Sequence, residues 1–312
     1  MKKVAVFAFS FILLLLWSVS AAELASSAAV MPSIRIRADG SIDPADVPIH
    51  RNGDVYTFAD DVHATMVVEK DNVVIDGAGY ALQGTYDGTR TDTWQVGQGP
   101  NQELSNETLW TIGLDFDVER KPNNLTVRNL NIRNFYIGMY VWTSNNTVVG
   151  SAVTDNIVGI LLSGDSNTIT GNYIAGNDEG IFFGVNNPGN EPLNIVLTEN
   201  SFVDNDVQFS GCFCEDTNTE EAVHSWDDGK SGNYWSDYAG ADANGDGIGD
   251  AAYVIDALNL DRYPLMKSAV APPSPAPKLP VETAVSAAAI ATVALVVVAA
   301  VAVRRRRRKT QS

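Results

Sequence analysis

The stretch Asn146-Thr-Val-Val-Gly-Ser-Ala-Val-Thr-Asp-Asn156 returns 21 residues later as Asn167-Thr-Ile-Thr-Gly-Asn-Tyr-Ile-Ala-Gly-Asn177. Related copies begin at Asn124 and Asn194, so successive copies start 22, 21 and 27 residues apart. The last spacing corresponds to one unit plus a short insertion. A fixed period of this size indicates a solenoid, in which each repeat stacks on its neighbours.

Each copy alternates apolar and polar residues and is rich in β-branched side chains, which favours strands over helices. Ten residues after each start stands a second corner residue (Asn134, Asn156, Asn177 and Asp204), and in the first three copies a Gly follows it (Gly138, Gly159 and Gly180). Asn and Gly suit corners because both tolerate left-handed backbone angles. Asn at the same place in each rung can also form a hydrogen-bonded ladder. The pattern therefore predicts an all-β, single-stranded parallel β-helix with about 21–22 residues per rung. A β-sandwich is the alternative.

An earlier stretch, Asn72-Val-Val-Ile-Asp-Gly-Ala-Gly-Tyr80, fits an upstream rung. It begins 52 residues before Asn124, which suggests two units plus a loop around Gln95–Asn106.

Three segments carry a family resemblance, namely Val74–Tyr80, Asn172-Tyr-Ile174 and Gly232-Asn-Tyr-Trp-Ser-Asp-Tyr238. They resemble the right-handed parallel β-helix repeat proteins of the NosD type and the wider carbohydrate-associated β-helix group, over roughly Ile34 to Met266. The resemblance implies a right-handed β-helix. It does not fix an activity, because this scaffold hosts lyases, hydrolases, adhesins and accessory proteins. The NosD-type resemblance also implies a link to copper-site maturation in an exported enzyme.

The two ends of the chain predict export and anchoring. Residues 1–22 have the basic, apolar and small-residue regions of a signal peptide. Residues 281–303 are predicted to form a transmembrane helix, because Thr283–Val303 is uncharged and would span about 31 Å. The basic tail 304–312 should stay cytoplasmic, which leaves the body outside the cell membrane. A sorting signal in which the span is cleaved and replaced is the alternative.

Between these ends we expect three segments. Residues 23–214 form the β-helix with its N-terminal cap, 215–266 form a C-terminal cap, and 267–280 form a Pro-rich linker. The net charge is -17, and eight of the 21 basic residues lie in Lys2, Lys3 and the 304–309 cluster. The exported part therefore carries 13 basic against 38 acidic residues, or -25, which opposes binding to nucleic acid.

The strongest local motif predicts a structural Ca²⁺ site in the C-terminal cap. Its expected ligands are Asp242, Asn244, Asp246, Ile248 through its carbonyl, and Asp250. Alternate oxygen ligands with Gly at the sixth position describe a loop wrapped around a hard cation. Tyr253 stands at the twelfth position, where an EF-hand has a bidentate Glu, so the affinity should be modest. A metal-free turn is the alternative.

Cys212 and Cys214 are the only cysteines. Outside the cytoplasm they favour a disulfide, although so small a loop would be strained. Free thiols, or a soft-metal site completed by His224, are the alternatives. Because the chain has three His and no Met-rich tract, the sequence argues against copper.

Three sequons, Asn106, Asn124 and Asn145, are candidate glycosylation sites. Aromatic residues between Trp226 and Tyr263 can pack the cap or stack on sugar rings.

For catalysis the candidates are carboxylates at nearly matching places on neighbouring rungs (Asp155, Asp178 and Glu179), together with Asp115 and Asp117. No base-plus-acid set accompanies them. We therefore expect a membrane-anchored extracytoplasmic protein with a glycan-binding, adhesive or structural role, whose partners are surface glycans. A polysaccharide lyase or glycoside hydrolase is the second hypothesis, and a copper-delivery accessory protein is the third.

Overall fold

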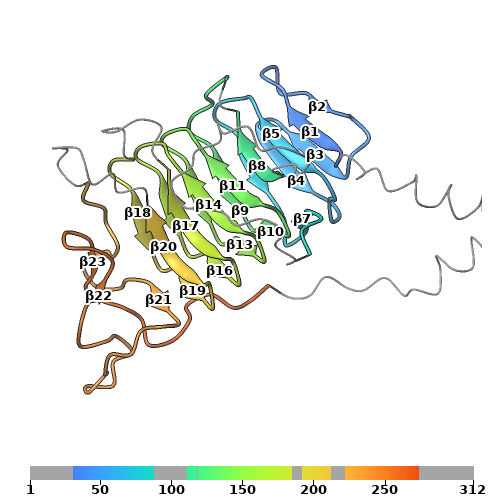
Figure 1. Cartoon of the computed structure of the whole chain (residues 1–312). Coiled ribbons are helices and arrows are strands. Elements are labelled where there is room, and N and C mark those ends of the chain that lie inside the picture. Colours follow the sequence, from blue (N-terminus) through green and yellow to red (C-terminus); the bar gives the residue numbers. More distant parts are fainter. Residues whose placement is uncertain (1–30, 88–110, 118, 185–191, 212–221, 274–312) are drawn as a thin grey trace, which may run out of the picture. The chain divides into compact units, whose positions relative to one another are not determined.

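The computed structural model describes residues 31–87, 111–117, 119–184, 192–211 and 222–273, in which all regular elements are strands. Most of them stack into three sheets that are parallel except for the pairs β1–β2 and β3–β4 at the N-terminal end (Figure 1). Sheet A contains β1 (Ser33–Ile36), β2 (Ile42–Asp43), β5 (Thr65–Val68), β8 (Ile112–Phe116), β11 (Ile137–Val141), β14 (Val158–Leu162), β17 (Glu179–Phe183) and β20 (Val207–Gly211).

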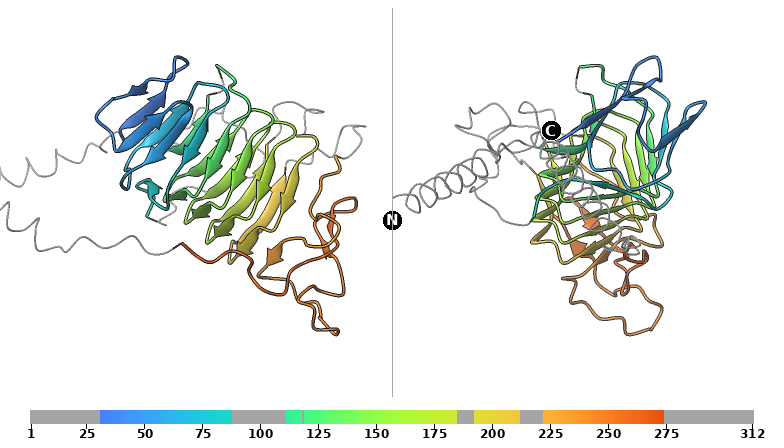
Figure 2. Two further views of the ribbon diagram at one scale, coloured as in Figure 1. Left: turned by 180° about the vertical axis from the view of Figure 1, so that it is seen from behind. Right: turned by 90° about the vertical axis from the view of Figure 1, so that its right-hand side faces the viewer.

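Sheet B contains β3 (Ile49–Asn52), β4 (Val55–Phe58), β6 (Val74–Asp76), β9 (Thr126–Arg128), β12 (Thr147–Val149), β15 (Thr168–Thr170) and β18 (Val196–Thr198). Sheet C contains β7 (Ala81–Gln83), β10 (Asn131–Arg133), β13 (Ala152–Thr154), β16 (Tyr173–Ala175), β19 (Ser201–Val203) and β21 (Tyr234–Trp235). A rung takes one strand from each sheet in the order B, C, A, and Figure 2 shows the rungs surrounding a common interior. The predicted parallel β-helix is confirmed.

The strand register corrects how the copies align. Thr126 pairs with Thr147, Thr147 with Thr168, and Thr168 with Val196, so the copies repeat after 21, 21 and 28 residues. Asn124 therefore matches Asn145 rather than Asn146. Aligning the copies by sequence alone matches two different kinds of Asn with each other, because the two kinds are adjacent in the chain and both recur from rung to rung.

The structure also corrects the number of rungs between Asn72 and Asn124. Val74 of β6 pairs directly with Thr126 of β9, so the 52 intervening residues form one rung with a long insertion, not two rungs. The insertion includes residues 88–110, which lie outside the described part of the chain.

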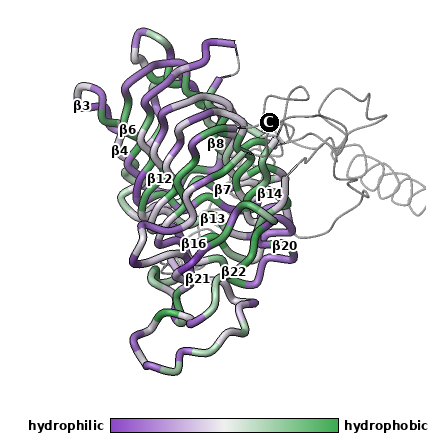
Figure 3. Tube along the Cα trace, turned by 90° about the vertical axis from the view of Figure 1, so that its left-hand side faces the viewer, coloured by the Kyte–Doolittle hydropathy of each residue, from purple (hydrophilic) through white to green (hydrophobic). Residues whose placement is uncertain are grey.

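Inward side chains form one continuous apolar core because strand residues alternate between the two faces of a sheet. In β12, β15 and β18 the central residues Val148, Ile169 and Leu197 are fully buried, while both their neighbours are partly exposed. Figure 3 shows the same alternation as green and purple along the rungs.

Buried Asn side chains run along all three corners as hydrogen-bonded ladders. At the corner between sheets A and B, the backbone N–H and Nδ2 of Asn146 both donate to Oδ1 of Asn167. At the corner between sheets B and C, the backbone N–H and Nδ2 of Asn172 both donate to Oδ1 of Asn200, and Asn200 donates in the same way to Asn233. At the corner between sheets C and A, Asn156 donates to Asn177 and Asn177 to Asn205. Each amide thus satisfies the backbone at a corner where no strand pairing can do so.

The exposed corners use a different residue class. Asn124, Asn145, Asn134, Asp155 and Asn194 all have positive φ, between 56° and 63°. Asn and Asp tolerate this left-handed conformation better than other residues with a side chain. Each corner therefore consists of an exposed left-handed residue followed by a buried position, which in the middle rungs is a ladder Asn.

Several predictions fall outside the described residues: the signal peptide 1–22, Cys212 and Cys214, the span 281–303 and the tail 304–312. Within the ranges that the structure describes, no helix is long and apolar enough to cross a membrane.

Replacing Asn200 with Ala should lower the free energy of unfolding by about 2–4 kcal/mol, because it leaves several buried partners on neighbouring rungs without a hydrogen bond. Those partners include Asn172, Asn233 and the carbonyl of Ile169. Urea unfolding followed by tryptophan fluorescence measures the change. Asn131→Ala is the control, since its exposed side chain makes one hydrogen bond, to the carbonyl of Gly79. Equal losses in the two variants would contradict the ladder's role.

Candidate functional site at the C-terminal cap

The cap closes the solenoid with a stack of aromatic rings. Trp235 of β21 lies flat on Phe202 of the last full rung, with ring centroids 4.4 Å apart. Tyr253 of β22 (Tyr253–Val254) covers the other face of Trp235 at 4.2 Å. Trp226, also fully buried, lies 6.0 Å from Trp235. Trp226, Trp235 and Tyr253 therefore pack the end of the core, which is one of the two roles expected for the aromatic residues of this segment.

The ladder at the corner between sheets B and C ends on a buried carboxylate in the cap. Asp261 of β23 (Leu260–Asp261) accepts the backbone N–H of Asn233 at 2.7 Å and the indole N–H of Trp235 at 2.9 Å. A Cβ on Gly232 would stand 1.8 Å from Oδ1 of Asp261, so this position requires Gly. A carboxylate accepts hydrogen bonds, so Asp261 provides the acceptor that the last N–H donors of the ladder, those of Asn233, require.

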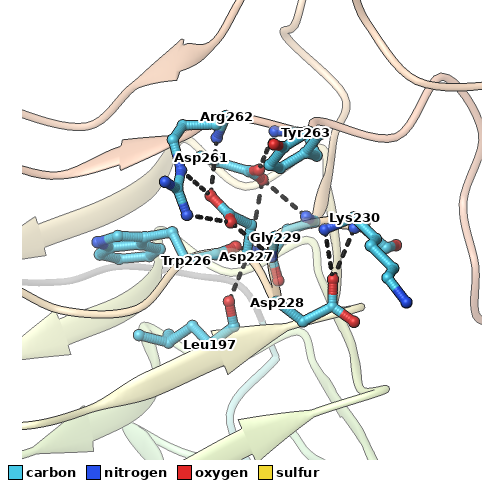
Figure 4. Close-up of polar contacts among 11 residues, drawn as sticks. Leu197, Trp226, Asp227, Asp228, Gly229, Lys230, Asp261, Arg262 and Tyr263 are labelled. Carbon is cyan, nitrogen blue, oxygen red and sulfur yellow. Dashed lines mark hydrogen bonds and ion pairs between the residues drawn. The ribbon is translucent and has the colours of Figure 1, made fainter.

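A second carboxylate fastens the cap hairpin to the chain after Trp226 (Figure 4). Asp227 accepts from Nε and Nη2 of Arg262, at 3.0 and 2.6 Å, and from the backbone N–H of Gly229 at 2.9 Å. Burial raises the pKa of Asp227, but the hydrogen bonds from Arg262 and Gly229 outweigh it and hold that pKa below its usual value.

The predicted Ca²⁺ loop is a turn organised by its own carboxylates. Asp242 accepts backbone N–H groups from Gly245, Asp246 and Gly247, at 2.8, 3.1 and 3.0 Å. Asp250 closes the turn by accepting from the N–H of Ala243 at 2.9 Å. All five predicted ligands thus belong to one short turn, but within the described residues its three Asp side chains do not gather into a group that could hold a metal ion.

Tyr238 connects this loop to the rest of the cap. Its hydroxyl donates to the carbonyl of Ala251 at 2.6 Å, and its ring lies 6.5 Å from that of Tyr253. A Cβ on Gly240 or Gly249 would stand about 2 Å from the hydroxyl, at 2.0 and 2.1 Å. The two glycines therefore admit the Tyr238 side chain between the loop's ends.

A cavity of about 220 Å³ lies where the last rung meets the cap. Asp206–Phe209 of the last rung form one wall, Tyr253–Ile255 form the other, and Asp237 adds a carboxylate. The hydroxyl of Tyr253 donates to Asp237, with oxygens 3.1 and 3.3 Å apart. This cavity was not predictable from the sequence, because its two walls are more than 40 residues apart and neither contains a motif.

The outer face of sheet A carries a second apolar cluster, formed by Ile137, Ile157, Val158 and Phe182 with partly buried neighbours that include Tyr140. Asp115 is in register with Tyr140 at this face, and its Oδ1 is buried without a hydrogen-bond partner. Burial has the largest effect on the pKa of Asp115, and together with the negative charge of Asp117 it raises that pKa to about 6. The positive charge of Arg35 acts in the opposite direction.

The carboxylates considered for catalysis do not meet in register. Ala175 pairs with Thr154, so the next residues of the two rungs are aligned as well. The residue aligned with Asp155 is therefore Gly176, which is not an acid. Glu179 is flanked in register by Val158 and Val207, and it accepts a hydrogen bond from Ser210 at 2.6 Å. The apparent match of Asp155, Asp178 and Glu179 between rungs is therefore wrong.

The described residues do not supply a copper-binding set. They contain no group of three or more His, Cys, Asp or Glu side chains that could hold a metal ion. Nδ1 of His224 is buried without a partner, and burial lowers the pKa of His224 to about 4, so its imidazole is neutral. One such nitrogen is not a copper site, and Cys212 and Cys214 lie outside the described ranges.

Of the three sequons, Asn124 and Asn145 lie at exposed corners. The side chain of Asn124 donates to that of Asn72 at 2.7 Å. Asn106 is outside the described residues.

The raised pKa of Asp115 predicts a pH-dependent effect of Asp115→Asn. Between the ordinary pKa of 3.8 and about 6, the native chain binds more protons than the unfolded chain, so stability falls as pH rises through this window. The variant should match the wild type near pH 4 and exceed it by about 2–3 kcal/mol at pH 7, from roughly two pKa units. Denaturant titration at several pH values measures this difference. A difference that is the same at every pH would contradict the assignment.

Comparison with known proteins places the chain in a family. No curated protein matches the sequence significantly. Residues 54–240, more than half of the chain, match the family described as "Periplasmic copper-binding protein (NosD)". This range covers the strands of sheets A–C from β4 to β21 and the start of the cap, and the periplasmic description agrees with an extracytoplasmic body. With its stacked parallel sheets and this match, the chain belongs to the NosD family of right-handed parallel β-helix proteins.

Proposed function

We propose that this chain is an extracytoplasmic β-helix module, tethered to the membrane by residues 281–303, that binds surface glycans through its C-terminal cap. The observation that carries the proposal is the cavity between the last rung and the cap. It combines carboxylates with an aromatic side chain, and such concave sites with a few convergent polar groups are the usual places for small ligands.

Two further features support a binding role over catalysis. Asp155, Asp178 and Glu179, the rung carboxylates considered for catalysis, are not in register with one another, so these three do not form the acid pair of a glycoside hydrolase. The rungs, tied together by buried hydrogen bonds up to the cap, give a binding site at the cap a rigid support.

Retention on immobilised polysaccharides tests the proposal. The full chain, in a detergent without a sugar headgroup, should be retained by at least one of a panel of neutral and acidic polysaccharides. The eluted polysaccharides should show no new reducing ends and no unsaturated uronates. Failure to bind any polysaccharide would contradict glycan binding, and turnover would instead favour the lyase or hydrolase hypothesis.

We also propose that Ca²⁺ binds the loop of Asp242–Asp250 and stabilises the cap. The support for this proposal is the alternating pattern of oxygen ligands. They lie in a turn whose carboxylates accept hydrogen bonds from its backbone N–H groups. Tyr238 would transmit the stabilisation to Tyr253 and the aromatic stack.

Removing Ca²⁺ should therefore lower the melting temperature, because a ligand that binds only the folded chain stabilises it by mass action. Asp246→Ala should melt at the chelated temperature with or without Ca²⁺. Asp228→Ala is the control: it removes caps on the N–H groups of Lys230 and Ser231, outside the loop, and should keep the full Ca²⁺ response. Identical wild-type melting curves with and without chelator would refute the site.

A copper-related role is the second candidate, and the family's description is the observation that favours it. The described residues offer it a single buried imidazole, at His224. Copper uptake by the full chain that is lost in Cys212→Ser would favour this role over glycan binding.

A further inference from the structure

We infer that the cavity at the cap binds one neutral pyranose ring of a glycan and discriminates against uronic acids. This inference rests on the proposed glycan-binding function and names the ligand chemistry of the same site. Four properties of the cavity carry it: its walls, its charge, its apolar rim and its size.

The walls of the cavity are strand backbones. Four consecutive residues, Asp206–Phe209, line one side, and three, Tyr253–Ile255, line the other. Neighbouring side chains of a strand point to opposite faces, so consecutive residues can line one cavity only if their backbone does so too. β20 is the last strand of sheet A and pairs with β17, while β22 pairs only with β23 among the described strands. Within the described part of the chain, the outer edges of β20 and β22 therefore have no strand partner, and their backbone N–H and C=O groups can bond to a ligand.

The charge of the cavity requires a ligand that donates hydrogen bonds. Asp206 and Asp237 both line it, and neither forms an ion pair within the described residues. An ionised carboxylate only accepts hydrogen bonds, and Tyr253 supplies Asp237 with one donor. Sugar hydroxyls fit this environment because each can donate to a carboxylate and accept from a backbone N–H.

The rim of the cavity is apolar. Val207 and Val254 line it and are 45% and 66% exposed, so apolar surface lies next to the cavity's carboxylates. A pyranose ring presents C–H groups on its faces and hydroxyls at its edge, so it can cover these valines while its hydroxyls reach the carboxylates. A bare cation would leave both valines in water.

Size and charge together define the ligand class. A volume of about 220 Å³ is below the range of about 300–1,000 Å³ typical of drug-sized ligands, which suits a single ring. A uronic acid would bring its own carboxylate next to Asp206 and Asp237, where like charges repel. The excess of acidic residues over the exported chain adds to this repulsion.

Saturation-transfer NMR on the full chain, in a zwitterionic detergent at fixed Ca²⁺, tests the inference with methyl glucoside, methyl galactoside, methyl mannoside and methyl glucuronide as probes. At least one neutral glycoside should bind, and methyl glucuronide should bind at least about tenfold more weakly than methyl glucoside or not at all. Asp206→Asn and Asp237→Asn should each weaken the neutral glycoside by about tenfold and reduce the discrimination against the glucuronide.

Asp204→Asn is the matched control, because Asp204 is exposed at the same end of the solenoid but does not line the cavity. It should bind as the wild type does, and melting curves should show that all three variants are folded. If polysaccharides are retained while Asp206→Asn and Asp237→Asn still bind like the wild type, the inference is wrong and glycan binding stands at another site. Equal binding of glucoside and glucuronide, or displacement of the glycosides by added Ca²⁺ at the cavity carboxylates, would also overturn it.

Discussion

The buried asparagine at the corner of a rung is the interaction on which the rest of the structure depends. A chain that turns between two sheets leaves backbone groups that no strand can pair, and burying them unpaired is costly. The Asn side chain solves this with one amide, since Asn172 uses Nδ2 to bond both the carbonyl of Val148 and the Oδ1 of Asn200. Because each amide needs the next rung, the ladder ties the rungs into a fixed register and makes the solenoid one cooperative body.

A ladder of this kind has to end, and its ends determine the architecture of the cap. At the C-terminal side, Asp261 replaces the next Asn and accepts the donors of Asn233 and Trp235. That carboxylate lies on the same hairpin as Tyr253, whose ring covers the aromatic stack and forms one wall of the cavity. The proposed binding site is therefore a consequence of how the solenoid is closed, not an addition to its surface.

The repeat predicted the fold because its period and its alternation of apolar residues follow directly from strand geometry. It did not predict the register, since Asn145 and Asn146 are adjacent and only the structure separates the left-handed corner from the ladder position. The alternation also did not predict the second apolar cluster on the outer face of sheet A, which includes Phe182 and Tyr140; of these, Tyr140 is in register with Asp115. The cavity could not be foreseen, because Asp206 and Tyr253 meet only through the path of the cap. The loop at Asp242 was recognisable, because its ligands are consecutive alternate residues of a single turn.

Backbone hydrogen exchange at the ladder positions is the most direct test of the central claim. The amide N–H groups of Asn146, Asn156, Asn172, Asn177 and Asn200 each donate to a side-chain oxygen of the next rung. The account predicts that these amides exchange as slowly as those of the central strands, since both open only when the solenoid unfolds. Exchange as fast as that of an exposed turn amide without a hydrogen-bond partner would contradict it.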